Sequence, residues 1–302
     1  MRDTFSQVIY TECKDNPNLI VVVADHGNDI FHDLYTNNIE KFINVGIAEQ
    51  NLYGVSAGLT NAGFLPIAYA LSSLGLTRAY DQIRIDIGYS SKPVLIVGDG
   101  IGFVYGTQGI THHAFEDVGM MSNIPNLTIL SPSDAISMKA CLYDYIANPR
   151  PVYLRISKNS AGEVYKEGEK FSINEPNLVI SNNSEIVVIS TASMSATIKK
   201  IISDNNILVD MIDVICLDQS SINTFHNNIG QYRKIIVIEE HMNQTGLSSK
   251  ISNLITTFNL DVRMKSYGTN ICFDENTGDR DFYLKKNSID LDSLFKILKD
   301  SE

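Results

Sequence analysis

The sequence contains no tryptophan and only 4 cysteines among its 302 residues. Cys13, Cys141, Cys216 and Cys272 lie far apart, with neither a CxxC motif nor a Cys/His spacing typical of metal ligands. In a chain of this length we interpret them as reduced thiols of a cytoplasmic protein. A small fold held together by disulfide bonds is therefore excluded.

Basic residues and long apolar runs are also scarce. The chain has 24 Lys and Arg against 35 Asp and Glu, a net charge of −11, and no basic cluster. A nucleic-acid partner requires a basic face, so none is expected. Aliphatic runs such as LIVVVA have the length of a strand, whereas a membrane span needs roughly 20 residues. With no signal-peptide pattern at its start, we expect a soluble protein without a membrane partner.

The chain does have a regular alternation of strand and helix patterns. In its first half, uniformly apolar runs predict strands at residues 19–24, 65–70, 93–98, 127–131 and 151–157. Helical patterns lie between them at residues 47–62, 76–87 and 133–147, the last with Ser133 as N-cap. Such strands are typical of a parallel sheet covered on both faces. We therefore predict a doubly wound α/β domain over residues 1–165.

A second α/β pattern follows a polar, turn-rich segment that we interpret as a linker, residues 166–183. Strands are predicted at residues 185–190, 207–213, 234–240 and 261–267, with helices near residues 193–203 and 246–258. These elements predict a second doubly wound α/β domain over residues 184–302, again with a largely parallel sheet.

Glu49 is the sole carboxylate in the small and apolar run FINVGIAEQNLYGVSAGLTNAGFLPIAYALSS. An unpaired buried carboxylate is costly, so such a group is usually paired, protonated or functional. The glycines around it, including Gly46, Gly54 and Gly58, are unfavourable in a helix and indicate close packing. Two interpretations remain open at this point. Glu49 either favours the helix dipole from the first turn, or is a buried acid kept protonated for proton chemistry.

Several motifs in one order resemble a known family. VGIAEQNLYGVSAGLTNAGFLPIAYA, LTRAYDQIRIDIG, GTQGITHHAFED, LSPSDA and PVYLRIS resemble transketolase and deoxyxylulose-phosphate synthase. The resemblance runs from about residue 2 to 158, and more faintly onward through VVISTASMSA and IVIEEHMNQTG. It implies a pyrimidine-binding domain followed by a transketolase C-terminal domain.

The resemblance implies thiamine diphosphate as cofactor. In this family the glutamate that matches Glu49 is a protonated acid that hydrogen-bonds to N1′ of the aminopyrimidine and so activates the cofactor. The aromatic residue that usually stacks on the pyrimidine is missing from residues 72–76. Tyr69 is the nearest ring, and Leu74 or Leu76 would otherwise supply an apolar surface. With Asp25, these are the candidate cofactor-binding residues.

Substrate contacts are implied in the same way. His112 matches the histidine of a TH motif that contacts substrate oxygens, and we expect it to be catalytic. Arg2 and Arg155 match two arginines that bind the substrate phosphate. Arg155 also lies in an otherwise apolar strand and therefore needs an anionic partner or solvent.

Three positions depart from the family pattern and bear on the substrate. Gln108 replaces an aspartate that reads a sugar hydroxyl, Asp29 replaces a phosphate-binding serine, and Gly100 replaces a phosphate-binding histidine. We expect Gln108 and Asp29 to contact a substrate whose phosphate is moved or absent. The VGDGIG stretch has the GDG of a metal-diphosphate motif but lacks the Asn pair that follows it. We interpret Asp99 as a strand-end turn residue and expect no metal site in this chain.

The resemblance covers only the pyrimidine half of a thiamine site. We therefore expect a separate N-terminal subunit that binds the diphosphate through Mg²⁺ or Ca²⁺, in an α₂β₂ heterotetramer. The small-residue helix that begins near Gly46 would lie at the interface between chains.

The leading hypothesis is the C-terminal subunit of a split transketolase. The enzyme would transfer a two-carbon ketol unit from a ketose to an aldose, with sugar or sugar-phosphate substrates of a specialised pathway. One alternative is the β subunit of a 2-oxoacid or acetoin dehydrogenase. Another is a non-catalytic partner that scaffolds an active thiamine enzyme.

Overall fold

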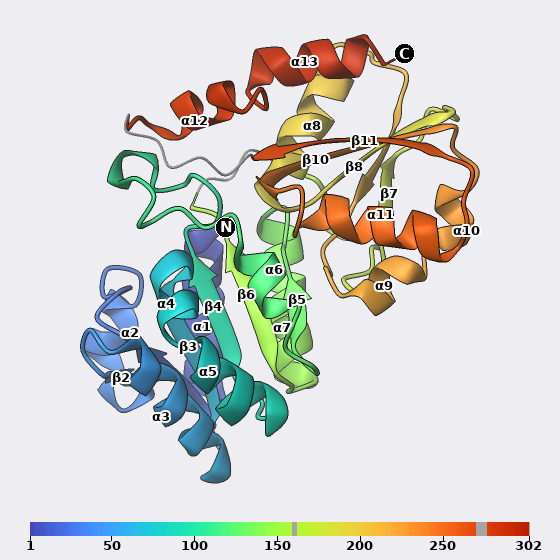
Figure 1. The fold of residues 1–302 in the computed structure, drawn as a ribbon. Coiled ribbons are helices and arrows are strands. Elements are labelled where there is room, and N and C mark those ends of the chain that lie inside the picture. Colours follow the sequence, from blue (N-terminus) through green and yellow to red (C-terminus); the bar gives the residue numbers. More distant parts are fainter. Residues whose placement is uncertain (159–161, 270–276, 302) are drawn as a thin grey trace.

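The computed structural model describes residues 1–158, 162–269 and 277–301, and each half of the chain builds one β-sheet with helices on both faces (Figure 1). The first sheet has the order β2-β1-β3-β4-β6-β5, and all its pairs are parallel. Its strands are β1 (Leu19–Val23), β2 (Phe42–Asn44), β3 (Leu65–Leu71), β4 (Leu95–Asp99), β5 (Thr128–Leu130) and β6 (Val152–Ile156). Every residue of β1, β4 and β6 is buried, as the uniformly apolar runs predicted.

The helices of the first domain follow the predicted alternation with several differences. They are α1 (Arg2–Asp15), α2 (His32–Asn37), α3 (Glu49–Asn61), α4 (Ser72–Arg78), α5 (Tyr80–Gln82), a π-helical turn (Ile83–Tyr89), α6 (Asp117–Met121) and α7 (Ala135–Ala147), with short 3₁₀ turns at Ile39–Lys41 and Gly106–Gln108. The N-cap of α7 is Asp134 and not Ser133, because the Asp134 carboxylate accepts a hydrogen bond from the Ser137 N–H. The polar helix α1 and the short α2 were not predicted.

The second sheet is parallel except at one edge. Its order is β11-β10-β8-β9-β7, and β7 runs antiparallel to β9. The strands are β7 (Asn177–Ile180), β8 (Ile186–Ser190), β9 (Asp210–Asp213), β10 (Lys234–Met242) and β11 (Arg263–Thr269). Strand β7 lies within the segment predicted as a linker. Its sequence, NLVI, is largely apolar but only 4 residues long, and as an edge strand with one neighbour it leaves its side chains half-exposed.

Helices cover both faces of this second sheet (Figure 1). They are α8 (Ala192–Asp204), α9 (Gln219–Asn223), α10 (His226–Ile229), α11 (Leu247–Thr257), α12 (Arg280–Lys286) and α13 (Leu291–Lys299). Within the described ranges, no helix is long and apolar enough to cross a membrane.

The two domains are joined by hydrogen bonds at buried positions. The Ser131 N–H donates to Ile215 O at 2.7 Å, beside the carboxyl end of β5. Asp213, at the end of β9, accepts hydrogen bonds from the hydroxyls of Ser133, Ser195 and Tyr165. Burial raises the pKa of Asp213 to about 6, although the three hydroxyls oppose this shift. The second domain is thus fixed beside the carboxyl ends of the first sheet.

Candidate active site

The candidate site lies along the carboxyl edge of the first sheet. Parallel strands end on the same side, and open α/β sheets bind ligands just outside these carboxyl ends. Glu49, His26 and Lys158 follow β2, β1 and β6, respectively, and Asp99 is the last residue of β4. Chain segments that are far apart in the sequence therefore supply polar side chains to one edge.

Glu49 is the first residue of α3 and faces an opening in the surface. Its side chain is 11% exposed, and Arg78 Nη1 lies 3.2 Å from Oε1. This neighbour comes from α4, 29 positions along the chain. Glu49 and Arg78 line an open depression of about 660 Å³ together with Ile47, which is 77% exposed. An adjacent guanidinium stabilises an ionised carboxylate.

Two of the three apolar candidates for the cofactor are enclosed in the core. The ring centroid of Tyr69 lies 5.8 Å from that of Phe5 and 5.2 Å from that of Phe31, and none of its surface is exposed. Tyr69 therefore cannot stack on a ligand, and the same burial applies to Leu76. Leu74, half-buried on α4, remains as an apolar side chain that reaches the surface.

Asn44 ties the loops that follow β1 and β2. Its Oδ1 accepts hydrogen bonds from the N–H of Asp25 at 3.1 Å and of Gly46 at 2.9 Å. Asp25 itself is exposed and has a φ of 62°. The sequence did not single out Asn44, yet this side chain holds the loop bearing Asp25 and His26 against the loop that leads to Glu49.

Asp99 is the centre of a buried polar cluster. Its Oδ2 accepts hydrogen bonds from His26 Nε2 at 2.9 Å and from the Tyr105 hydroxyl at 2.7 Å. Burial alone would raise the pKa of Asp99, but these two hydrogen bonds and the charge of Arg2 bring it below its ordinary value. Among the described residues, Asp99 Oδ1, Arg2 Nε and the Tyr69 hydroxyl are buried without a hydrogen-bond partner. The prediction of a strand-end turn residue missed this role.

Arg2 is directed toward this cluster from the first turn of α1. Burial lowers its pKa, but the charge of Asp99 and the hydroxyls of Tyr69 and Tyr105 more than offset that effect, so the net shift is upward. Arg2 is half-buried. Its positive charge therefore already faces a carboxylate inside the chain.

His112 and His26 are linked through the ring of Tyr105. The Tyr105 centroid lies 6.5 Å from that of His26 and 6.1 Å from that of His112. His112 is half-buried, and its Nδ1 lies 2.9 Å from the Thr111 hydroxyl. The Ser73 hydroxyl donates to Thr111 O at 3.0 Å, which ties the His112 loop to α4. The structure thus brings His112 to the same edge as the Asp99 cluster.

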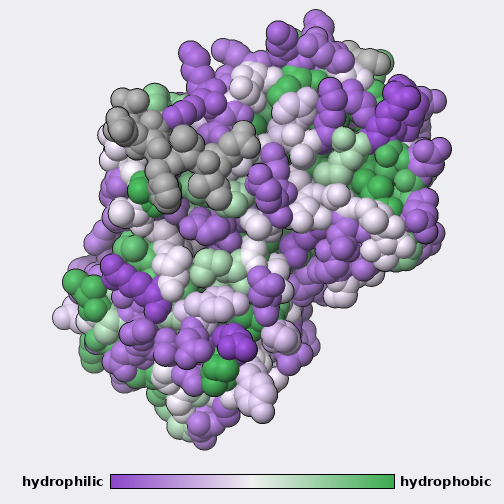
Figure 2. All heavy atoms as spheres, in the orientation of Figure 1, coloured by the Kyte–Doolittle hydropathy of each residue, from purple (hydrophilic) through white to green (hydrophobic). Residues whose placement is uncertain are grey.

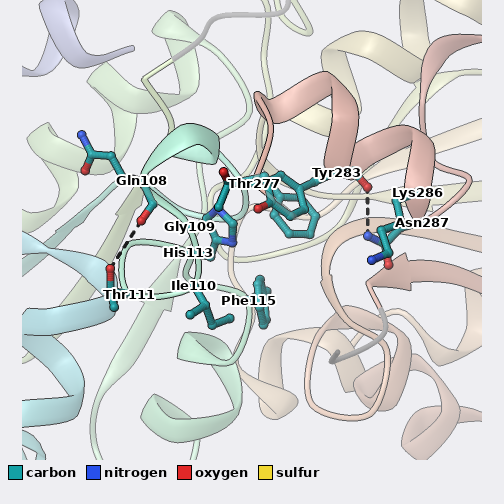
Figure 3. Close-up of a pocket in the computed structure, with 11 residues that line it drawn as sticks. Gln108, Gly109, Ile110, Thr111, His113, Phe115, Thr277, Tyr283, Lys286 and Asn287 are labelled. Atoms are coloured by element: carbon teal, nitrogen blue, oxygen red, sulfur yellow. Dashed lines mark hydrogen bonds between the residues drawn. The ribbon is translucent and has the colours of Figure 1, made fainter. Parts of the chain in front are cut away.

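Gln108 and His113 belong to the other side of the same loop. A cavity of about 250 Å³ lies between this loop and α12. In Figure 3, Gln108 points away from His113 and Tyr283. Gln108 is exposed, whereas His113 is buried and its Nε2 lies 3.1 Å from Gly106 O. Burial lowers the pKa of His113. His113 therefore packs the loop, whereas the side chain of Gln108 is exposed on it.

Arg155 is fully paired inside the protein. Its Nε and Nη2 donate to the Asp117 carboxylate at 2.7 and 3.1 Å, and its Nη1 donates to Ser131 Oγ. His241 Nε2 lies 3.2 Å from Asp117 Oδ1 and joins this ion pair to the second domain. With 2% of its side chain exposed, Arg155 is a structural residue and is not available to a substrate phosphate.

The exposed cation at the end of β6 is Lys158. Its Nζ lies 6.0 Å from the centroid of the Tyr105 ring. The sequence contained a signal that could have identified Lys158, since this residue follows the same strand as Arg155. The side chain at position 155 points into the domain interface, whereas position 158 lies beyond the strand.

Tyr105 also accounts for the missing side chain at position 100. A Cβ added to Gly100 would lie 2.2 Å from Tyr105 Cε2, so the tyrosine ring occupies the space of that side chain. Gly100 has a φ of 83°, which also favours glycine. Asp29 is exposed on the loop after β1.

Comparisons with known proteins agree with this arrangement. Residues 1–163 match the transketolase pyrimidine-binding domain, and residues 177–274 match the transketolase C-terminal domain. An apulose-4-phosphate transketolase subunit from Actinobacillus succinogenes is 26% identical, over 93% of this chain and 91% of that protein. A 1-deoxy-D-xylulose-5-phosphate synthase from Chlamydia felis is 26% identical over 97% of this chain but 46% of its own length.

A solved structure described as a split gene transketolase, inactive beta4 tetramer, has the same fold. It superposes with a TM-score of 0.86 at 23% identity and covers 99% of this chain and 97% of that one. The pyrimidine-binding model matches more than half of the chain, and the carboxyl edge of the first sheet carries the polar cluster described above. The protein belongs to the transketolase family.

Proposed function

We propose that this chain is the C-terminal subunit of a split, thiamine-diphosphate-dependent transketolase that transfers a two-carbon ketol unit from a ketose to an aldose. The observation that carries the proposal is the position of Glu49, whose carboxylate opens onto an uncovered depression beside the exposed Ile47. The match over nearly the full length of the apulose-4-phosphate transketolase subunit supports the same conclusion.

The residues at this edge fit the pyrimidine end of thiamine diphosphate. The depression holds a carboxylate that can meet a ring nitrogen, and Ile47 and the half-buried Leu74 offer apolar surface in place of an aromatic ring. When bound, the cofactor supplies a centre that stabilises the two-carbon carbanion. Glu49 would hold a proton at its carboxyl oxygen for the pyrimidine, and Arg78 would have to release Glu49 for that contact. Closure by a second chain would exclude water and favour the protonated acid.

The other functional groups lie further along the same edge. His112 would contact a substrate oxygen. Lys158 would be a cation close to it, since both side chains lie against the Tyr105 ring. The buried pair of Arg155 and Asp117 holds β6 against the second domain.

We propose that a separate N-terminal subunit covers the depression and holds the cofactor diphosphate with its metal ion. Ile47, beside Glu49, is 77% exposed in the single chain. Two further large apolar side chains of the first domain are exposed on the π-helical turn, Ile85 at 41% and Tyr89 at 83%. Figure 2 shows hydrophobic patches on the surface of the first domain among hydrophilic ones. Such exposed apolar residues are typical of a surface that a partner covers. An α₂β₂ assembly would place each cofactor between two kinds of chain.

The test is reconstitution with the N-terminal subunit and comparison of Glu49→Gln with the wild type. Loss of a positioned acid should lower kcat at least about 100-fold. Assembly, measured by light scattering, should be unchanged. Glu40→Gln, on the exposed turn before β2, is the matched control and should keep wild-type activity.

Other outcomes separate the alternatives. Release of CO₂ from pyruvate without ketol transfer would identify a 2-oxoacid dehydrogenase subunit. Full activity of Glu49→Gln in the complex would make this chain a scaffold.

A further inference from the structure

His26 occupies a central position on the carboxyl edge without a role in the function proposed above. It follows β1, which lies between β2 and β3 in the sheet, and Asn44 fixes its loop against the loop that leads to Glu49. On its other side, His26 meets Asp99 and Tyr105. His26 therefore lies between the Glu49 depression and the His112 loop.

The ring of His26 is held in one orientation. Its Nε2 lies 2.9 Å from Asp99 Oδ2, and its face stacks on Tyr69 with centroids 5.6 Å apart and planes at 14°. Asp99 is fully buried, whereas 27% of the His26 side chain is exposed. A carboxylate that accepts from one ring nitrogen fixes the tautomer, so that the neutral ring presents the other nitrogen as an acceptor. No hydrogen bond to Nδ1 occurs within the described part of the chain.

The charges at this edge do not suit a phosphate dianion. Arg78 pairs with Glu49, Arg155 pairs with Asp117, and Arg2 faces Asp99. The strong recognition of a phosphate uses charge-assisted hydrogen bonds, often from a bidentate arginine. Arg78 and Arg155 are therefore each paired with a carboxylate, and the charge of Arg2 is opposed by that of Asp99.

Anionic and uncharged groups fill the remaining edge. Asp25 and Asp29 are exposed on the loop that carries His26, and Tyr105 covers Gly100. Among the described residues, Lys158 and the half-buried Arg2 are cations at this edge with no carboxylate within ion-pair distance, and the charge of Asp99 opposes that of Arg2. A surface with this balance favours hydroxyl groups over a doubly charged phosphate.

We propose that His26, oriented by Asp99, accepts a hydrogen bond through Nδ1 from a hydroxyl of an unphosphorylated ketose substrate. This inference rests on the proposed function and names the substrate class and a residue that selects it. His26 contacts the sugar, whereas Asp99 is a positioning residue that acts through the imidazole. Tyr105 closes the site where a side chain at position 100 would otherwise lie.

The experiment uses the reconstituted complex and two matched pairs of donors. D-xylulose is compared with D-xylulose 5-phosphate, and D-fructose with D-fructose 6-phosphate, each with glycolaldehyde as acceptor. The wild type should show a higher kcat/KM for the unphosphorylated member of a pair. His26→Gln keeps a donor at the position of Nε2 but loses the acceptor at Nδ1. It should lower kcat/KM for that sugar about 10- to 100-fold, mainly through KM, since one hydrogen bond to the substrate is lost.

Two further variants separate contact from folding. His32→Gln changes an exposed histidine on α2 and should match the wild type. Asp99→Asn should lower kcat/KM for the same sugar. The double variant with His26→Gln should have a kcat/KM no lower than that of the less active single variant, because both changes act on one contact. Tyr105→Phe, which retains the ring and Asp99, should change KM less than His26→Gln.

The outcomes distinguish this inference from the proposed function. A wild-type complex that turns over none of the four ketoses overturns the proposed function, and the inference with it. An active complex that prefers the phosphorylated donors, or in which His26→Gln has wild-type KM, overturns the inference alone. An additive double variant would show that Asp99 does not act through His26.

Discussion

Buried charges in this molecule occur as joined clusters, and each cluster depends on every member. Asp117 is shared by Arg155, His241 and the Tyr153 hydroxyl, which itself lies 2.7 Å from Ser72 Oγ at the start of α4. Breaking such an ion pair is costly because the remaining charge is left buried without a partner. One carboxylate therefore holds β6, the second domain and the helix that carries Leu74.

Replacement of Asp117 by Asn should destabilise the protein by about 3–5 kcal/mol, because the Arg155 guanidinium stays buried without its counter-charge. Urea unfolding of the wild type and the variant measures this difference. Asp117→Asn combined with Arg155→Met removes both charges and should recover a large part of the loss. Equal stability of the single and double variants would contradict this account.

The same carboxylate sets a dependence on pH. Burial alone would raise the pKa of Asp117, but the charge of Arg155 and the hydrogen bond with His241 hold it well below the ordinary value of 3.8. Its contribution is therefore complete above the ordinary value and is lost as the pH falls below it. The unfolding free energy of Asp117→Asn should fall less steeply below pH 4 than that of the wild type.

At the level of single residues, candidate site residues could be proposed from the sequence, whereas their contacts could not. Glu49 and His112 could be singled out because a local motif surrounds each of them. The partners of Glu49 and Asp99 could not be predicted, because Arg78, His26 and Tyr105 reach them through the order of the strands. Arg155 illustrates the same limit: its need for an anionic partner was predicted, but Asp117 lies on a different element.

Among the secondary-structure elements, α7 shows how a local cap becomes a tertiary anchor. Asp134 Oδ1 accepts from the N–H of Ser137, as a helix cap does. Its Oδ2 accepts from the N–H groups of Val164 and Tyr165 at 2.8 Å each. The cap thus also fixes the segment that follows β6.

Asp134→Ala should cost about 3 kcal/mol, because it removes a cap worth about 1 kcal/mol and leaves two buried N–H groups unpaired. Asp290→Ala is the matched control, since Asp290 caps α13 through Ser293 alone, and it should cost about 1 kcal/mol. Hydrogen exchange at residues 163–165 should rise in Asp134→Ala and not in the control. A similar cost for the two variants would show that the second pair of bonds contributes nothing.

Elements that bury both faces were predicted, and those that bury one face weakly were not. The central strands of both sheets have uniformly apolar sequences, which only a covered parallel sheet explains. Strand β7 has one neighbour and half-exposed side chains, and its short, largely apolar run, NLVI, lies within a polar, turn-rich segment that masked it. The boundary of α7 depended on which of two adjacent polar residues caps the helix.

At the scale of the whole molecule, the first domain exposes large apolar side chains, including one beside Glu49. Ile47 is 77% exposed, and Tyr89 is 83% exposed on the π-helical turn of the same domain. Two domains with parallel sheets were expected and were found, with the fold of a split transketolase. How the domains dock was beyond the sequence, because Asp213 and Asp117 draw their partners from both.

Ile47→Arg should abolish assembly with the N-terminal subunit while changing the unfolding free energy of the isolated chain by less than about 0.5 kcal/mol. A charge in the centre of a docking surface is costly to desolvate, whereas the same charge on an exposed face costs little. Leu178→Arg, at a half-exposed position of β7, is the control and should assemble normally. Size-exclusion chromatography with light scattering measures the complex, and normal assembly of Ile47→Arg would place the interface elsewhere.

The tyrosine over Gly100 has a consequence for how relatives of this protein are compared. Position 100 taken alone suggests that a functional side chain is missing, because the residue there is a glycine. In the structure this space is filled by the ring of Tyr105, five positions further along the chain. A comparison of single sequence positions treats Gly100 and Tyr105 separately, whereas the two share one space in the structure. Relatives that share this substrate should therefore vary at the two positions together, glycine with an aromatic residue.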